Sequence, residues 1–233
     1  MPKNFSPHGK KPRFKQKQLI QIYRRLLKYF GHRNWWPART PFEVMLGAIL
    51  TQNTSWANVQ RAIHNLKRVK ALNAQKIAAM DLKKLQQLIR PSGYFRQKAD
   101  RLKIFANFFL APPIRGSIAR MKKIEPARMR EMLLAVKGIG PETADSILLY
   151  ALGHPVFVVD AYTRRIFARL GMVPQKIDYE QLRKLFEQNL PRDSELFNDF
   201  HAQLVALGNQ YCRKKPRCSS CPLAELEKCR TDS

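Results

Sequence analysis

Four cysteines are grouped near the end of the chain, and their spacing is suited to holding a metal. They are Cys212, Cys218, Cys221 and Cys229, in the pattern C-x5-C-x2-C-x7-C, interleaved with Arg213, Lys214, Lys215 and Arg217. Disulfides are not expected of a basic protein in a reducing compartment. Four thiolates so close in sequence favour one shared soft metal centre, either a structural zinc or an iron–sulfur cluster. The spacing alone leaves both open.

The sequence Lys137-Gly138-Ile139-Gly140-Pro141 is a second candidate site, because it separates two stretches with helical periodicity. The apolar residues of the first stretch are Met129, Met132, Leu133 and Val136, and those of the second are Ala144, Ile147, Leu148 and Ala151. Pro126 and Pro141 stand where first-turn prolines are common. The pattern predicts two helices, over 126–136 and 142–152, that pack together across a very short turn.

The two glycines of this turn suit contact with a phosphate. Gly138 and Gly140 have no side chains, so the N–H groups of the turn stay accessible to an approaching anion. We expect Ile139 to insert into the core. A plain pair of helices is the alternative interpretation. The pattern L-x4-G-I-G-x2-T-A from Leu133 to Ala144, in a chain of formal charge +26, favours binding of the DNA backbone.

Asp160 is a third candidate, in the segment Val158-Val159-Asp160-Ala161-Tyr162-Thr163-Arg164-Arg165. An aspartate just before a helix is a common N-cap, which is a structural interpretation. A carboxylate can also stabilise positive charge that develops on a sugar and orient a water molecule. The two roles are compatible.

Helices must position these residues, because apolar residues recur at helical spacing almost everywhere and strand-like alternation is scarce. Helical stretches are expected at 19–30, 59–66, 82–89, 99–110, 126–136, 142–152, 163–170, 179–190 and 195–207. The segment Phe42 to Leu50 is apolar nearly all round, which predicts a helix buried on every side. We expect an all-α protein of about ten helices.

The hairpin and the Asp160 segment resemble the helix-hairpin-helix DNA glycosylase superfamily, and within it the endonuclease III-like group. The Asp160 segment is similar to the V-D-T-H-x-x-R element of that superfamily. The N-terminal half is most similar to the 3-methyladenine glycosylase branch. The matching segments are Asn34-Trp35-Trp36-Pro37, Phe42 to Thr54 (FEVMLGAILTQNT) and Arg90 to Ala99 (RPSGYFRQKA). The resemblance extends over residues 20 to 210.

This resemblance implies a two-lobed helix-hairpin-helix glycosylase fold with a C-terminal four-cysteine cluster loop. The expected parts are a basic N-terminal arm over 1–17, a cluster-side lobe from 18–40 and 155–211, a helical-barrel lobe over 41–154 that contains the hairpin 126–152, and a cluster loop over 212–229. We expect the arm to be poorly ordered without DNA.

The resemblance also implies the chemistry, with Asp160 as the essential carboxylate of N-glycosidic bond cleavage. Bifunctional members carry a lysine in the hairpin that attacks C1' and then promotes strand cleavage through a Schiff base. This chain has Glu142 at that position. Glutamate forms no Schiff base, so hydrolysis by water is expected. Lys137 is the nearest other lysine, and its place in the turn suits phosphate contact better.

The base pocket implied by the resemblance is aromatic. In the 3-methyladenine branch the Trp-Trp-Pro element and an aromatic residue after Gln-Asn-Thr line it, and the positions here are Trp35, Trp36, Pro37 and Trp56, with Glu142 beside them. Aromatic faces replace the stacking partners of a flipped base and attract a cationic alkylated purine. The alternative interpretation is that these tryptophans are ordinary core residues.

The expected DNA face combines two segments. Gln52 and Asn53 correspond to the place where the family inserts a polar side chain into the gap left by the flipped nucleotide. The hairpin adds backbone and side-chain contacts, which we assign to Lys137, Gly138, Ile139, Gly140 and Thr143.

The endonuclease III-like family carries a 4Fe-4S cluster at the position of the four cysteines, usually with the spacing C-x6-C-x2-C-x5-C. The first and last gaps differ in this chain. We expect the cluster, with structural zinc as the alternative, and we expect it to hold a basic loop against DNA.

Composition agrees with a polyanionic partner. Lys and Arg number 43 against 17 Asp and Glu, and they are spread along the whole chain. No apolar run of about 18 residues and no signal-peptide pattern occur, so no membrane association is expected. We expect a monomer in the cytoplasm, associated with the nucleoid, whose partner is double-stranded DNA with damaged bases.

The leading interpretation is a monofunctional glycosylase for alkylated purines such as 3-methyladenine. One alternative is an endonuclease III-like glycosylase and AP lyase for oxidised pyrimidines, against which Glu142 and the tryptophans argue. The other alternative is a non-catalytic protein that binds DNA lesions, against which Asp160 argues.

Overall fold

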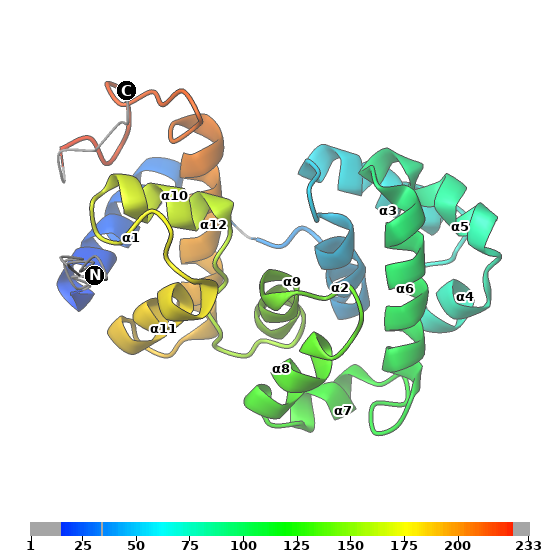
Figure 1. Cartoon of the computed structure of the whole chain (residues 1–233). Coiled ribbons are helices and arrows are strands. Elements are labelled where there is room, and N and C mark those ends of the chain that lie inside the picture. Colours follow the sequence, from blue (N-terminus) through cyan, green and yellow to red (C-terminus); the bar gives the residue numbers. More distant parts are fainter. Residues whose placement is uncertain (1–14, 34, 226–233) are drawn as a thin grey trace, which may run out of the picture. The chain divides into compact units, whose positions relative to one another are not determined.

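The computed structural model describes residues 15–33 and 35–225, and in these ranges the chain is helical without a strand (Figure 1). The prediction of an all-α protein is confirmed. The chain divides into two compact units, which are described separately. We call residues 35–156 the hairpin unit, and residues 1–34 together with 157–233 the cysteine unit. No described helix is both long and apolar enough to cross a membrane.

The hairpin unit is built around one buried helix. Its elements are α2 (Pro41–Leu50), α3 (Trp56–Arg68), α4 (Ala74–Ala79), α5 (Leu82–Ile89), a 3-10 turn η1 (Arg90–Ser92), α6 (Phe95–Leu110), α7 (Ile118–Lys123), α8 (Pro126–Leu134), α9 (Pro141–Ser146) and a π-helical turn η2 (Ile147–Ala151). Every residue of α2 from Phe42 to Leu50 is buried, as the apolar sequence predicted. Thr40 caps this helix by accepting a hydrogen bond from the Glu43 N–H at 3.2 Å.

A buried lysine anchors the end of α2. Lys98 in α6 is 1% exposed, and its Nζ donates to the carbonyl oxygens of Leu50 at 2.9 Å and Ser92 at 2.7 Å. Burial, with a smaller contribution from the charge of Arg101, lowers the pKa of Lys98 from 10.5 to about 8. The last turn of α2, from which the segment with Gln52 and Asn53 continues, is therefore tied to η1 and α6.

The cysteine unit consists of α1 (Gln16–Phe30), α10 (Ala161–Arg169), α11 (Tyr179–Asn189) and α12 (Ser194–Gln210), followed by an irregular segment. Its core is rich in phenylalanine, and the five buried rings are Phe157, Phe167, Phe186, Phe197 and Phe200. The rings of Phe157 and Phe186 stack in parallel with centroids 3.9 Å apart. Phe157 begins the segment that leads to α10, and Phe186 lies in α11. The stack therefore packs this segment against α11.

The structure differs from the expected helices in two respects. The short helices α4 and α7 have six residues each, too few for an apolar period, but each begins at a side-chain cap, Asn73 and Ser117. The second hairpin helix was expected over 142–152. It is α-helical only as far as Ser146, after which η2 adds one residue per turn. Apolar periodicity cannot distinguish such a turn from a continuing α-helix.

Candidate active site

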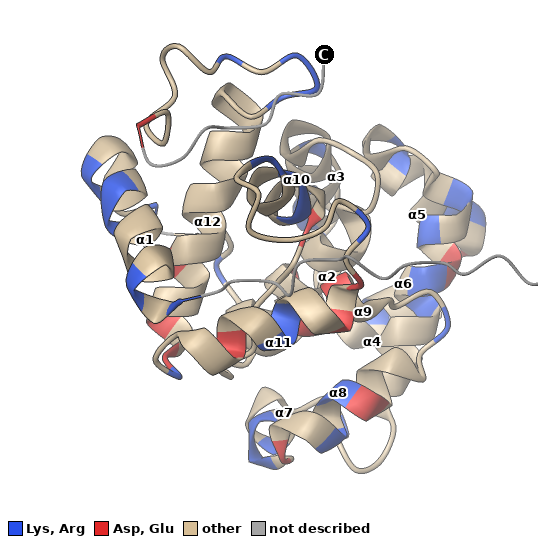
Figure 2. Ribbon diagram, turned by 60° about the vertical axis from the view of Figure 1, so that its left-hand side comes forward, with Lys and Arg blue, Asp and Glu red and all other residues tan. Residues whose placement is uncertain are grey.

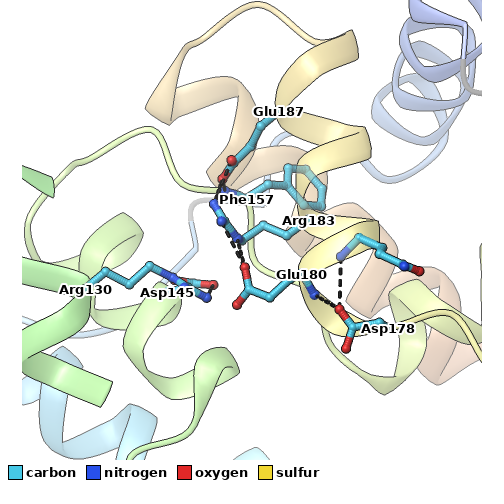
Figure 3. Close-up of polar contacts among 8 residues, drawn as sticks. Arg130, Asp145, Phe157, Asp178, Glu180, Arg183 and Glu187 are labelled. Carbon is cyan, nitrogen blue, oxygen red and sulfur yellow. Dashed lines mark hydrogen bonds and ion pairs between the residues drawn. The ribbon is translucent and has the colours of Figure 1, made fainter. Parts of the chain in front are cut away.

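A buried ion pair holds the two helices of the hairpin together. Arg130 in α8 donates from Nε to Oδ1 of Asp145 at 2.6 Å and from Nη2 to Oδ2 at 3.1 Å (Figure 3). Asp145 in α9 is fully buried. A two-pronged contact of this kind fixes orientation as well as distance. This ion pair therefore fixes the two helices on either side of the turn relative to each other.

The two glycines of the turn have different environments. Gly138 has φ +89, and a Cβ there would lie 2.6 Å from Cγ of Arg101, so both the backbone and the packing require glycine. Gly140 has φ −94 and open space around its Cβ position. Ile139 is buried, as expected, while Lys137 and Gly140 are exposed. The turn therefore presents backbone to solvent at Gly140 without a side chain over it.

Gln52 and Asn53, which were assigned together to the DNA face, have different environments. The Gln52 amide donates to the carbonyl of Gly138 at 3.2 Å and to Oγ1 of Thr143 at 3.0 Å, and its oxygen accepts from Arg101. Thr143 is buried. Asn53 is exposed and has a left-handed backbone with φ +54. In this structure Gln52 braces the hairpin turn, and Asn53 is presented to solvent.

The three tryptophans form one aromatic cluster in the hairpin unit. The ring centroids lie 5.4 Å apart for Trp35 and Trp36, 5.5 Å for Trp35 and Trp56, and 5.1 Å for Trp36 and Trp56. All three rings are partly exposed. Tyr150 joins the cluster at 5.3 Å from Trp36. No local pattern marks Tyr150 as part of this cluster, because it stands 114 positions after Trp36 among the aliphatic residues of η2.

Trp36 lies directly on the central helix at a glycine. A Cβ at Gly47 in α2 would be 3.2 Å from both Cζ2 and Nε1 of the indole. A glycine inside a helix costs roughly 1 kcal/mol relative to alanine, so this position favours close approach over helix stability. The other expected pocket residues, Pro37 and Glu142, are exposed. Glu142 lies in the first turn of α9.

Asp160 is the N-cap of α10, as the structural interpretation predicted. Its Oδ1 accepts from the Thr163 N–H at 2.7 Å and from Thr163 Oγ1 at 2.9 Å. Its Oδ2 lies 3.7 Å from Nε2 of His201 in α12, with the two side chains 12% and 7% exposed. Burial lowers the pKa of His201, and the Asp160 charge opposes this shift without reversing it. His201 is a neighbour that sequence analysis did not identify.

The segment that leads to Asp160 is anchored on α11. The N–H of Phe157 donates to Oε1 of Glu187 at 3.0 Å, and Arg183 binds both oxygens of Glu187 at 2.7 Å (Figure 3). Arg183 also contacts Glu180 at 3.0 Å. The chain around Asp160 is therefore held on both sides, by α11 at Phe157 before it and by the cap of α10 after it.

Three of the four cysteines lie in the described part of the cysteine unit. The free thiols of Cys212, Cys218 and Cys221 line one apolar cavity together with Ile166, Leu207 and Leu223. Burial, with the neighbouring Cys212 and Cys218, raises the pKa of the Cys221 thiol. Cys229 and residues 1–14 of the predicted N-terminal arm lie outside the described residues. Within the described ranges no three His, Cys, Asp or Glu side chains are arranged to hold a metal ion.

Two arginines of α10 support this cysteine segment. Arg165 donates from Nε to the carbonyl of Cys212 at 2.7 Å. Arg169 donates from Nη1 to Sγ of Cys212 at 3.4 Å and to the carbonyl of Arg213 at 2.6 Å. The segment is thus fixed through its carbonyl oxygens and one sulfur.

Positive charge is distributed over the helices of both units, and acidic residues are fewer (Figure 2). Several acidic side chains are already engaged, since Asp81, Asp178 and Asp193 cap helices. The surface that remains suits a polyanion.

Comparison with known proteins gives the class. Residues 46–192 match the HhH-GPD superfamily of base excision DNA repair proteins. A candidate DNA repair glycosylase of Methanocaldococcus jannaschii is 48% identical over 214 residues, which are 91% of this chain and 96% of the relative. The chain therefore belongs to the HhH-GPD superfamily, and it is a base-excision DNA glycosylase of endonuclease III-like type.

Two solved structures show the same fold. A 3-methyladenine DNA glycosylase of H. pylori, bound to 1,N6-ethenoadenine, has 31% identity and a TM-score of 0.73, over 84% of this chain and 98% of that chain. A non-covalent complex of endonuclease III with DNA has 24% identity and a TM-score of 0.78, over 94% of this chain and 96% of that chain. The predicted superfamily and its helix-hairpin-helix fold are confirmed.

Proposed function

We propose that this glycosylase excises alkylated purines and that it does so by hydrolysis, without a lyase step. The observation that carries the proposal is the cluster of Trp35, Trp36, Trp56 and Tyr150 in one unit. Electron-rich aromatic faces attract a cationic base such as 3-methyladenine more strongly than a neutral one. The similarity to a 3-methyladenine glycosylase bound to an adenine adduct supports the same substrate class.

In the proposed reaction Asp160 stabilises the oxocarbenium-like sugar and orients the attacking water. Its Oδ1 is engaged by Thr163, which leaves Oδ2 for this work. An alkylated purine is a good leaving group once it carries a positive charge, so strong acid catalysis is not required. Glu142 occupies the place of the lyase lysine in the hairpin, and a carboxylate cannot form a Schiff base.

The proposed DNA contacts come from the hairpin turn and from two exposed side chains. The N–H groups near Gly140 bind a phosphate, with Lys137 beside them. Asn53 and Tyr94 are the candidates for insertion into the duplex. Tyr94 is 67% exposed and has a left-handed backbone with φ +44. Proteins that bind the DNA minor groove insert large exposed side chains between base steps, and Tyr94 could act in the same way.

We also propose that Cys212, Cys218, Cys221 and Cys229 hold a 4Fe-4S cluster. The shared apolar cavity of the first three thiols and the donor from Arg169 to Cys212 Sγ suit a buried thiolate-bound centre. Four soft sulfur ligands also fit structural zinc, so metal analysis must distinguish the two. When bound, the centre would organise a basic segment and take no part in base release.

The test is release of free bases from methylated DNA, measured by chromatography, with Asp160→Asn as the inactive control. Asparagine is as good an N-cap as aspartate, so this variant should keep its melting temperature. Asp178→Asn is the matched cap control, because Asp178 caps α11 in the same way, and it should keep full activity. We expect the wild type to release 3-methyladenine or 7-methylguanine and Asp160→Asn to release neither.

Two results would contradict parts of this proposal. If the wild type releases oxidised pyrimidines and no alkylated purine, the substrate class is wrong. If it cleaves the strand at abasic sites, the monofunctional mechanism is wrong.

A further inference from the structure

A buried histidine lies beside the carboxylate that we assign to catalysis. His201 is in the middle of α12, and its side chain is 7% exposed. Its Nε2 is 3.7 Å from Oδ2 of Asp160. This oxygen is the one that the N-cap does not use, since Oδ1 accepts both hydrogen bonds from Thr163. His201 therefore lies beside the carboxylate oxygen that the N-cap leaves unheld.

The separation of 3.7 Å is longer than a hydrogen bond. A movement of less than about 1 Å would bring the two atoms into hydrogen-bond range, and catalytic contacts are often long in the free enzyme and tighten with substrate. Thr163 fixes one end of the carboxylate, so rotation about that end moves Oδ2 toward or away from Nε2. The geometry is that of a carboxylate with one fixed oxygen and one adjustable oxygen.

Charge makes a histidine suitable at this position. Burial keeps His201 neutral at neutral pH, because its pKa lies below the ordinary value. A neutral imidazole with its proton on Nε2 can donate to Oδ2 without cancelling the negative charge. A lysine or arginine there would neutralise the carboxylate that the oxocarbenium-like sugar requires.

The neighbouring residues of α12 show that His201 is an exception on this helix. Most of its buried residues are apolar, and they include Phe197, Phe200, Ala202 and Leu204. Gln203, the other buried polar residue of α12, donates from its amide to the carbonyl of Gly31 at 2.7 Å, beyond the end of α1. His201 lies beside the candidate catalytic carboxylate.

We propose that His201 is a positioning residue that sets Oδ2 of Asp160 for base excision by donating to it from Nε2 when substrate binds. The proposal rests on the catalytic role proposed for Asp160. It predicts that the excision rate depends on an N–H donor at this position and does not require an imidazole ring.

The experiment compares His201→Gln with His201→Leu. The amide nitrogen of glutamine reaches approximately where Nε2 lies, whereas leucine fills space without a donor. In single-turnover excision from methylated DNA, we expect His201→Leu to be slower by on the order of tenfold to a hundredfold, the loss typical of a hydrogen bond to a charged group. We expect His201→Gln to recover most of the rate. Affinity for DNA with an abasic-site analogue should be unchanged in both variants.

Gln203→Leu is the matched control for a general loss of packing, because Gln203 is a buried polar residue two positions further along α12. It should lower the melting temperature and leave the excision rate of the folded enzyme unchanged. If His201→Leu does not fold, His201→Asn replaces it, because the shorter amide cannot reach Oδ2.

The outcomes separate this inference from the proposed function. If Asp160→Asn excises bases as fast as the wild type, the catalytic role of Asp160 is wrong. If Asp160→Asn is inactive while His201→Leu has the wild-type rate, or if His201→Gln is as slow as His201→Leu, only the positioning role is overturned.

Discussion

The hairpin turn and the cysteine segment are both irregular, but the protein holds them in different ways. The turn around Gly138 and Gly140 is closed by side-chain contacts within its own unit, namely the Arg130–Asp145 ion pair and the bracing amide of Gln52. The segment after α12 is held by arginines that donate to backbone carbonyls, and three of its cysteines line an apolar cavity. Side-chain contacts complete the hairpin turn, whereas the segment with the cysteines is the one that the proposed metal centre would further stabilise.

The largest expected effect is that of losing a cysteine, which should alter the cysteine segment and leave the hairpin turn unchanged. Cys212→Ser should lower the iron or zinc content of the purified protein strongly, because one of the four proposed ligands is lost. It should also expose the segment over residues 211–225 to limited proteolysis. The hairpin unit should keep its protection against hydrogen exchange. Equal loss of protection in both units would show that the two regions are not independently held.

The next effect concerns the ion pair of the hairpin. Arg130→Met leaves the fully buried carboxylate of Asp145 without its two-pronged partner, so we expect the free energy of unfolding to fall by about 3 to 5 kcal/mol. Arg128→Met on the same helix removes an exposed pair with Glu131 and should cost less than about 1 kcal/mol. Urea unfolding measures both. Similar losses of unfolding free energy in the two variants would show that the Arg130–Asp145 pair stabilises the fold no more than the exposed Arg128–Glu131 pair does.

The smallest effect is a pH dependence within the hairpin unit. Because the folded-state pKa of Lys98 is about 8, below its ordinary value of 10.5, the unfolded chain binds more protons between these two pH values. Stability should therefore rise with pH across that window, by roughly 3 kcal/mol for this group. Urea unfolding of the wild type and of Lys98→Met is measured from pH 7.5 to 10.5. The contribution of Lys98 is the difference between the two variants in how steeply the free energy of unfolding rises with pH. Parallel curves would show that Lys98 does not titrate in this range.

The parts of the molecule that depend on local sequence pattern are predictable from the sequence. The apolar segment Phe42 to Leu50 gave the buried helix, and Gly-Ile-Gly between two apolar periods gave the hairpin. The N-cap position of Asp160 also followed from its place before a helix. Each of these features depends on neighbours within a few residues.

The contacts between distant residues could not be predicted in this way. His201 stands 41 positions after Asp160, and nothing in α12 shows which buried polar residue would face it. Gln52 was assigned to the DNA face because a motif marks the residue, yet a motif does not tell which way the amide points. The role of Gly47 appears only when the indole of Trp36 is seen against it.

The aromatic cluster has a consequence for spectroscopy. The chain contains three tryptophans, and all three lie in this one cluster. The tryptophan fluorescence of the protein therefore originates from the proposed base pocket. With centroids 5.1 to 5.5 Å apart, the indoles will share excitation, so a base that stacks among them changes the emission of the whole protein at once. If the cluster is the base pocket, its fluorescence would report binding of the flipped base separately from base release, without any added label.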